Sequence, residues 1–136
     1  FFFKQKTAYE IPKRDWSSDV CSSDLESDLD TVTALSGSGP AYVFFFIEAM
    51  TQAGIDMGLS AAQAQRLAVG TFVGASELAR TSSEPPSVLR ERVTSRGGTT
   101  YAAITSMQTD EMAQRFARAL RAARSRAQEL GDEFGA

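Results

Sequence analysis

The feature that most constrains the fold is a run of seven apolar residues, Ala41 to Ile47, which directly follows Gly39 and Pro40. Proline is tolerated in the first turn of a helix because its missing N–H has no intrahelical partner there. The pattern therefore predicts a helix that reaches to about Gly58, with Ser38 as its cap. Its large apolar side chains cover more than a full turn, so this helix must be buried on nearly every side.

Burying such a helix is difficult for a chain of this size, because small domains bury a smaller share of their surface. We therefore expect it to lie at an interface between subunits or domains, with a central helix in a monomeric bundle as the alternative. Glu48 ends the apolar run and is the one acid in this helix that is a candidate for burial. A structural hydrogen bond to a neighbouring helix is favoured for Glu48 over acid–base chemistry.

The composition of the chain changes near residue 25. All three lysines, the only Trp and the only Cys lie before this point, and alanine occurs once before it and nineteen times after it. Residues 1–25 have no sustained helical or strand period, and they resemble the peptide produced when a sequencing adapter is translated in frame. We interpret residues 1–25 as an artefact, with a poorly ordered N-terminal tail as the alternative, and assign the folded domain to residues 26–136.

Residues 26–136 contain only helical patterns, so the sequence predicts an all-α fold. Residues 30–35 are expected to form an early helical stretch that breaks at Ser36-Gly37. Ser60 and Gln63 form a capping box at the start of a second long helix. The small residues of that helix permit close helix approach; they are Ala64, Ala68, Gly70, Gly74 and Ala75.

Two further helices are expected towards the C-terminus. Pro85 and Pro86 break the chain, and a short helix is predicted over residues 87–93, with Pro86 in its first turn. A last amphipathic helix is predicted after Thr109, with Asp110 and Glu111 complementing the positive end of its dipole and Gly131 ending it. Its apolar stripe consists of Met112, Phe116, Ala119, Leu120, Ala123, Ala127 and Leu130.

The composition excludes several classes of function. The chain has no histidine and one cysteine, which argues against a Cys/His zinc site and a disulfide framework. No metal site is expected. A net charge of -3 argues against general nucleic-acid binding, so the arginines of the last helix are interpreted as a solvated face. No apolar run approaches the roughly 18 residues that a membrane span needs, and no targeting segment is recognised, so we expect a cytoplasmic protein without a membrane partner.

The segment Ser95 to Thr100 is the strongest candidate for chemistry. Gly97 and Gly98 allow backbone conformations that other residues rarely adopt, and they directly precede a predicted helix start. The first N–H groups of a helix have no internal partner, and together with the helix dipole they favour an anion. Hydroxyls from Ser95, Thr99 and Thr100 lie in the same segment. The residues alone favour an ordinary helix cap over an anion site.

Two blocks, TALSGSGPAYVFFFIEAM at residues 33–50 and VTSRGGTTYAAI at residues 93–104, resemble the signature of the pyrroline-5-carboxylate reductase family. The resemblance covers about residues 26–136. It implies an all-α helical bundle of the type found at the C-terminus of 6-phosphogluconate dehydrogenase, interlocked as a homodimer. Assembly beyond the dimer is left open.

The resemblance also implies an activity and a set of site residues. Enzymes of this family reduce 1-pyrroline-5-carboxylate to L-proline with NAD(P)H. By motif position, Ser95, Gly97, Gly98 and Thr99 would bind the substrate carboxylate, and Thr100 would be the catalytic residue, with its hydroxyl against the ring nitrogen. Many members have proline where this chain has Arg96, so the role of Arg96 is left open.

The cofactor domain of the family is not recognised in this sequence. No strand followed by G-x-G-x-x-G and a helix occurs, and Ser36 to Pro40 does not match that pattern. We therefore expect the chain to be a piece of the reductase that lacks the N-terminal Rossmann domain, binds no nicotinamide cofactor and is inactive by itself. The alternatives are a non-enzymatic helical dimerisation module and a related imine or hydroxy-acid dehydrogenase domain.

Overall fold

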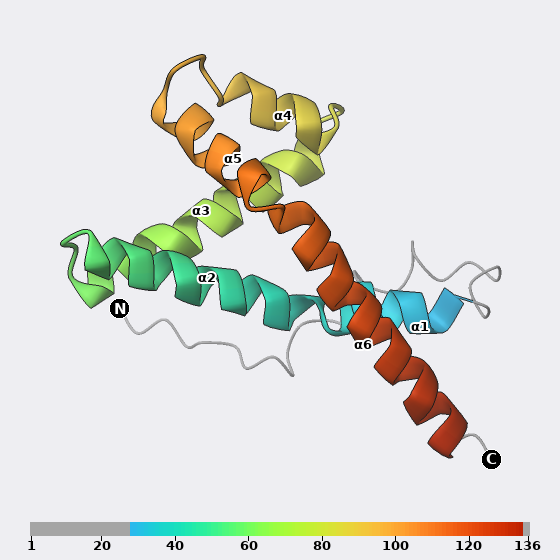
Figure 1. The fold of residues 1–136 in the computed structure, drawn as a ribbon. Helices are drawn as coiled ribbons and strands as arrows, with labels where there is room; N and C mark the ends of the chain where they lie inside the picture. Colours follow the sequence, from blue (N-terminus) through green and yellow to red (C-terminus); the bar gives the residue numbers. More distant parts are fainter. Residues whose placement is uncertain (1–27, 135–136) are drawn as a thin grey trace.

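The computed structural model describes residues 28–134, and within this range every regular element is helical. Six α-helices and one π-helical turn follow one another along the chain (Figure 1). Their bounds are α1 (Leu29–Val32), η3 (Thr33–Gly37), α2 (Gly39–Asp56), α3 (Ala61–Thr81), α4 (Pro86–Arg92), α5 (Thr99–Thr109) and α6 (Met112–Phe134). The all-α prediction is confirmed for these residues. The interpretation of residues 1–25 lies outside them.

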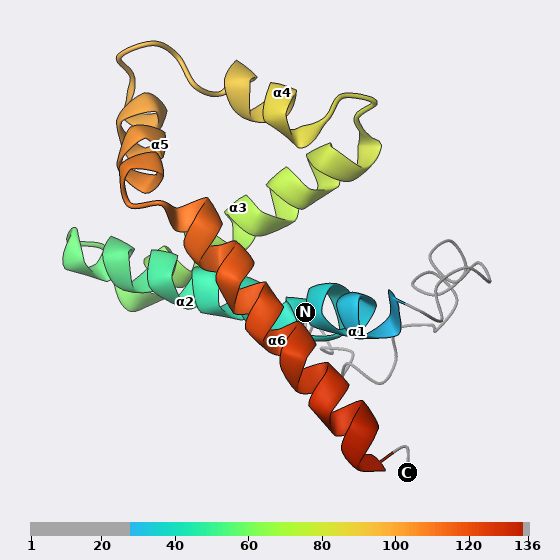
Figure 2. The same ribbon diagram turned by 45° about the vertical axis from the view of Figure 1, so that its right-hand side comes forward.

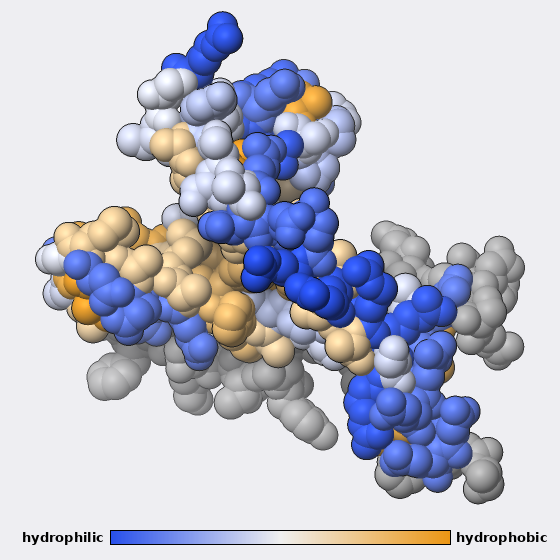
Figure 3. All heavy atoms as spheres, in the orientation of Figure 1, coloured by the Kyte–Doolittle hydropathy of each residue, from blue (hydrophilic) through white to orange (hydrophobic). Residues whose placement is uncertain are grey.

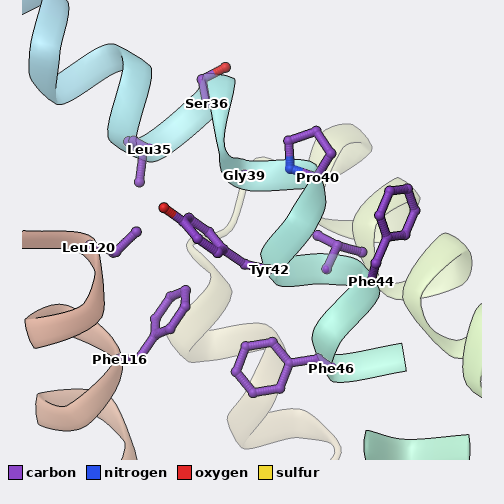
Figure 4. Close-up of a pocket in the computed structure, with 10 residues that line it drawn as sticks. Leu35, Ser36, Gly39, Pro40, Tyr42, Phe44, Phe46, Phe116 and Leu120 are labelled. Carbon is purple, nitrogen blue, oxygen red and sulfur yellow. The ribbon is translucent and has the colours of Figure 1, made fainter. Parts of the chain in front are cut away.

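The elements α1, η3 and α2 follow one another with only Ser38 between η3 and α2, and the chain bends between Ser36 and Pro40 (Figure 4). The break predicted at Ser36-Gly37 is a π-helical turn, in which the Ser38 N–H donates to the carbonyl of Thr33 at 2.9 Å. Ser38 is at the predicted N-cap position of α2, but its side chain makes no capping bond. A capping residue normally has an extended backbone, whereas Ser38 has helical angles (φ -85°, ψ -11°) as it leaves the π turn.

Helices α2 and α3 form the main helix–helix packing (Figure 1). The connecting turn uses a positive φ of 104° at Gly58, and the predicted capping box between Ser60 and Gln63 is present in full. Ala64 and Ala68 are buried against α2, as their small size predicted. Gly70 and Gly74 have no atom within 4 Å of a built Cβ, so they make no close approach within the described chain.

Helices α3, α4 and α5 lead around to α6, which returns across η3 and α1 (Figures 1 and 2). Helix α4 begins at Pro86, one residue before the predicted bound. Helix α6 begins at Met112 with no acid in its first turn. Asp110 instead follows α5 as its C-cap, and Glu111 has a left-handed backbone with φ 54°. The predicted start of α6 directly after Thr109 is therefore two residues too early. The Arg115 N–H donates to the Glu111 carbonyl at 3.0 Å, so both acids still lie next to the positive end of the α6 dipole.

Helix α6 continues past Gly131 to Phe134, so the predicted end at Gly131 is also wrong. Glycine in a helix interior costs only about 1 kcal/mol relative to alanine. The Arg126 guanidinium bonds to Glu129 at 2.8 Å and to Glu133 at 3.2 Å, which ties together the turns on either side of Gly131. These pairs also raise the pKa of Arg126, most through the hydrogen bond to Glu129 and next through the hydrogen bond to Glu133.

The described chain has a very small core of its own. Among residues 28–134, the buried hydrophobic side chains are Ala34, Ala64 and Ala68, and no large side chain is fully buried. Phe44 and Phe45 remain 63% and 65% exposed, and hydrophobic spheres line the part of the surface where α2 lies (Figure 3). Helix α2 is therefore not the buried central helix of a monomeric bundle among these residues.

Within the same range, no helix combines the length and apolar composition needed to cross a membrane.

Candidate functional site

The candidate site is the segment between α4 and α5. Its first part is fixed by hydrogen bonds to the end of α4: Thr94 donates its N–H to the Glu91 carbonyl at 3.0 Å and its hydroxyl to the Arg90 carbonyl at 2.6 Å. A tight turn follows, closed by the Gly98 N–H, which donates to the Ser95 carbonyl at 3.0 Å. This turn brings both ends of the segment Ser95–Gly98 together at the start of α5.

The two glycines are required for different reasons. Gly97 has φ 74°, in the left-handed region that side chains disfavour. Gly98 has an extended backbone with φ -82°, so its angles are open to any residue. A Cβ on Gly98, however, would lie 2.5 Å from the Ser95 Oγ and 3.2 Å from the Ser95 carbonyl oxygen. Gly98 is therefore required by the close approach of Ser95.

Helix α5 begins at Thr99 with Gly98 as its N-cap, and no side chain caps it. The first bond of the helix runs from the Ala102 N–H to the Gly98 carbonyl at 3.1 Å. The N–H groups of Thr99, Thr100 and Tyr101 precede that bond, so the helix itself gives them no acceptor. An oriented set of amide donors at the positive end of a helix dipole can hold a carboxylate.

The structure brings all five predicted site residues together in this loop and the first turn of α5. Ser95, Gly97 and Thr99 are exposed, and Gly98 and Thr100 are half-buried. Because the Gly98 N–H is already bonded to Ser95, it is not a free donor in this conformation. Arg96 lies in the same loop and is exposed.

An apolar hollow lies elsewhere in the described chain, between the start of α2 and helix α6 (Figure 4). Its volume is about 700 Å³, and none of the five predicted site residues lines it. Its walls are almost entirely apolar. The Phe116 ring lies edge-on to Tyr42 and Phe46, with centroid separations of 5.7 and 5.6 Å. Sequence reasoning missed this hollow, although the aromatic run and the stripe of α6 supply its lining.

Glu48 is not buried in the described chain, so that part of the prediction is wrong. It lies on the exposed side of α2 and lines a small hollow of about 280 Å³ together with Thr51 and Gln65. The nearby Thr51 Oγ1 is shielded and has no hydrogen-bond partner among the described residues. Helix α2 packs against α3 through Gly54 and Ala64, and this packing leaves Glu48 towards solvent.

A family model described as pyrroline-5-carboxylate reductase dimerisation matches residues 26–130. The chain belongs to this family. The match begins where the composition changes, and it includes both the apolar helix and the glycine–threonine loop. The resemblance drawn from the two sequence blocks is thereby confirmed.

Curated relatives and solved structures agree with the family match. The chain is 47% identical over 112 residues to the pyrroline-5-carboxylate reductase of Pseudomonas aeruginosa, covering 82% of this chain and 41% of the relative. It is 40% identical to the Arabidopsis thaliana enzyme, covering 77% of this chain and 38% of the relative. The chain thus spans about two fifths of the length of these relatives.

The fold matches solved reductases over the same part of their chains. The crystal structure of the Plasmodium falciparum enzyme, which has NADP bound, aligns with a TM-score of 0.75 at 34% identity, covering 78% of this chain and 40% of that one. The Coxiella burnetii enzyme aligns with a TM-score of 0.74 at 40% identity, covering 82% and 40%. The chain therefore has the fold of one part of the reductase, the part for which the family model is named.

Proposed function

We propose that this chain supplies the dimerisation and substrate-binding part of a pyrroline-5-carboxylate reductase, which reduces the cyclic imine 1-pyrroline-5-carboxylate to L-proline with NAD(P)H. The observation that carries the proposal is that the family match includes the Ser95–Thr100 loop, and that this loop presents unpaired helix amides next to hydroxyl groups. These are the donors that a small cyclic substrate with one carboxylate requires.

The proposal includes a homodimer formed through the apolar faces of α2 and α6. Phe44 and Phe45 are largely exposed in the single chain, and burying a phenylalanine contributes about 1.5–3 kcal/mol. The hollow beside Phe116 offers a second apolar surface of the same kind. A second copy of the chain would cover both surfaces, in agreement with the dimerisation role for which the family is named.

Within the site, we assign the carboxylate to the backbone around Ser95, Gly97, Gly98 and Thr99. The open N–H groups at the start of α5 are the donors, and Gly98 contributes by letting Ser95 fold against it. The half-buried Thr100 hydroxyl is assigned to the ring nitrogen of the substrate. Its role is to orient the imine by a hydrogen bond, so no strong acid is needed if the iminium form binds.

The described residues do not fit the Rossmann mode of holding a nicotinamide dinucleotide, because residues 28–134 contain no strand leading into a glycine-rich turn and a helix. The role proposed for this chain is therefore to bind and orient the substrate. We expect this chain alone to show no oxidation of NAD(P)H in the presence of the imine. A cytoplasmic location stays a prediction that cell fractionation can test.

The proposal is tested in a chimera that joins residues 26–136 to the cofactor-binding part of the Pseudomonas aeruginosa relative. We expect the chimera to oxidise NAD(P)H with the imine, and Thr100→Ala to lower kcat/KM about a hundredfold while the dimer persists. The matched control is Thr105→Ala, an exposed threonine further along α5. An active chimera whose rate is unchanged by Thr100→Ala would contradict the assigned role and favour another substrate, and an inactive chimera that still dimerises would favour the non-enzymatic module.

A further inference from the structure

One ion pair in the described chain links two separate segments. The pairs Glu77–Arg80 and Arg126–Glu129/Glu133 each lie within a single helix. Glu84, in contrast, precedes α4, whereas its partner Arg92 is the last residue of α4. The pair therefore joins the entry and the exit of this short helix.

The geometry of this pair is that of a strong contact. One nitrogen of the Arg92 guanidinium donates a hydrogen bond to one oxygen of the Glu84 carboxylate, and a second nitrogen lies in ion-pair contact with the other oxygen. Such bidentate pairs combine charge with fixed orientation. The Glu84 side chain is only 32% exposed, against 64% for Arg92. Exposed ion pairs contribute little on average, and a bidentate, partly shielded pair is the exception.

Both ends of the pair are themselves held. The Glu84 N–H donates to the Ser82 Oγ at 3.0 Å, and Pro85 and Pro86 follow it with restricted backbones. At the other end, the hydrogen bonds from Thr94 to the carbonyls of Arg90 and Glu91 continue the ordered chain up to Ser95. A displacement of α4 is therefore transmitted directly to the Ser95–Thr100 loop.

Helix α4 has little else to hold it in place. It is seven residues long, and an isolated helix of that length is not stable in water. An open apolar hollow of about 310 Å³ separates part of α4 from α3, and Val93 at its end is 64% exposed. The side-chain contact that bridges α4 from end to end is thus the Glu84–Arg92 pair.

We propose that Glu84 and Arg92 are positioning residues that fix α4, and through it the Ser95–Thr100 loop, in the conformation that receives the substrate carboxylate. This inference rests on the function proposed for the loop. The pair acts on the geometry of the anion site and so on substrate affinity. Glu84 and Arg92 themselves need not touch the substrate.

The test uses the 136-residue chain and its variants Glu84→Gln, Arg92→Gln and the exchanged pair Glu84→Arg with Arg92→Glu. Hydrogen exchange of residues 93–100 reports the order of the loop, and NMR titration with L-proline reports affinity through the amides of Gly97 and Gly98. We expect each single variant to speed loop exchange and weaken L-proline binding about three- to fivefold. The exchanged pair should recover at least half of both effects.

Glu77→Gln is the matched control, because it breaks an ion pair of the same chemistry within α3. It should leave both readouts unchanged, and recovery by the exchanged pair is a result that a general loss of stability would not give. Single variants that behave like Glu77→Gln would overturn the proposal. If L-proline causes no chemical-shift changes in the unaltered chain, the proposed substrate role of the loop fails for this chain. The hydrogen-exchange rates of residues 93–100 then decide by themselves whether the Glu84–Arg92 pair positions the loop.

Discussion

Gly54 of α2 lies so close to Ala64 of α3 that a Cβ built on Gly54 would be 3.0 Å from the Ala64 Cβ. Gly54 and Ala64 are both buried, and they lie at the contact where the apolar helix α2 packs on α3. Small residues at this crossing let the two backbones approach, and each additional carbon atom there has to displace one of the helices.

We therefore expect Gly54→Val to destabilise the chain by about 1–3 kcal/mol, since overpacking a close contact costs that much. Urea denaturation followed by circular dichroism measures the change. The control is Gly131→Val in α6, where nothing lies within 4 Å of a built Cβ. Equal stability of the two variants would show that the α2–α3 crossing tolerates the extra carbons.

Phe44→Glu tests the proposed dimer. Phe44 is 63% exposed in the single chain, so a charge at this position is costly only if another molecule covers it. We expect the dimer dissociation constant to rise more than tenfold, which corresponds to about 1.4 kcal/mol, as measured by sedimentation equilibrium. Gln128→Glu on the polar side of α6 should leave the constant unchanged. A Phe44→Glu variant as dimeric as the unaltered chain would place the interface elsewhere.

The sequence predicts the start of a helix well where the residues that determine it lie within one turn of each other. The Ser60–Gln63 box depends on two side chains within one turn, and both of its bonds are present. The helix end at Gly131 and a capping bond from Ser38 are not observed, because contacts with more distant residues decide both. Arg126 holds the helix together across Gly131, and the π turn that ends at Gly37 gives Ser38 a helical backbone.

In the candidate site, too, features set by neighbouring residues were predicted and those set by distant contacts were not. The glycines of the loop were predicted to allow unusual backbone angles, and Gly97 has such an angle. The reason for Gly98 was hidden, because it depends on how Ser95 folds back. The hollow between Tyr42 and Phe116 joins segments far apart in the chain, and no periodicity indicates which helix crosses which.

Tyr42→Phe tests the π turn at the start of the apolar helix. The Tyr42 hydroxyl donates to the Ala34 carbonyl at 2.8 Å, across the turn formed by η3. Losing this bond should cost about 1 kcal/mol, while the edge-on contact with Phe116 can persist. We expect faster hydrogen exchange at residues 33–38 and unchanged exchange in α3. Unchanged exchange at residues 33–38 would mean that the turn holds without Tyr42.

Glu77→Gln tests the pH dependence of α3. The hydrogen bond from Arg80, and secondarily its charge, lower the pKa of Glu77 below its ordinary value of 4.5, while desolvation opposes them. A lowered pKa in the folded state stabilises the fold above the unfolded pKa, and this contribution is lost as the pH falls through the folded pKa. We expect a small drop in Tm for the variant at about pH 7 that shrinks towards about pH 3 and in high salt. A drop that grows at low pH would reverse the assigned sign.

Gly98→Ala tests whether the loop geometry itself forms the anion site. The added methyl group would lie 2.5 Å from the Ser95 Oγ and 3.2 Å from the Ser95 carbonyl oxygen. Serine can rotate its hydroxyl away, but the carbonyl belongs to the turn that the Gly98 N–H closes. The turn must therefore widen, which moves the open amides at the start of α5. We expect L-proline affinity to fall about tenfold or more, measured by NMR titration.

Two further variants separate the two contacts of Gly98. Adding Ser95→Ala to Gly98→Ala removes the hydroxyl clash and leaves the carbonyl contact, so binding should recover only in part. Gly97→Ala changes no contact, since nothing lies within 4 Å, and acts through its positive φ of 74° alone, at a cost of about 1–2 kcal/mol. Full recovery of L-proline binding in the double variant would mean that the Ser95 hydroxyl alone makes glycine necessary at position 98. Undiminished binding in Gly98→Ala would mean that the amides at the start of α5 do not hold the carboxylate.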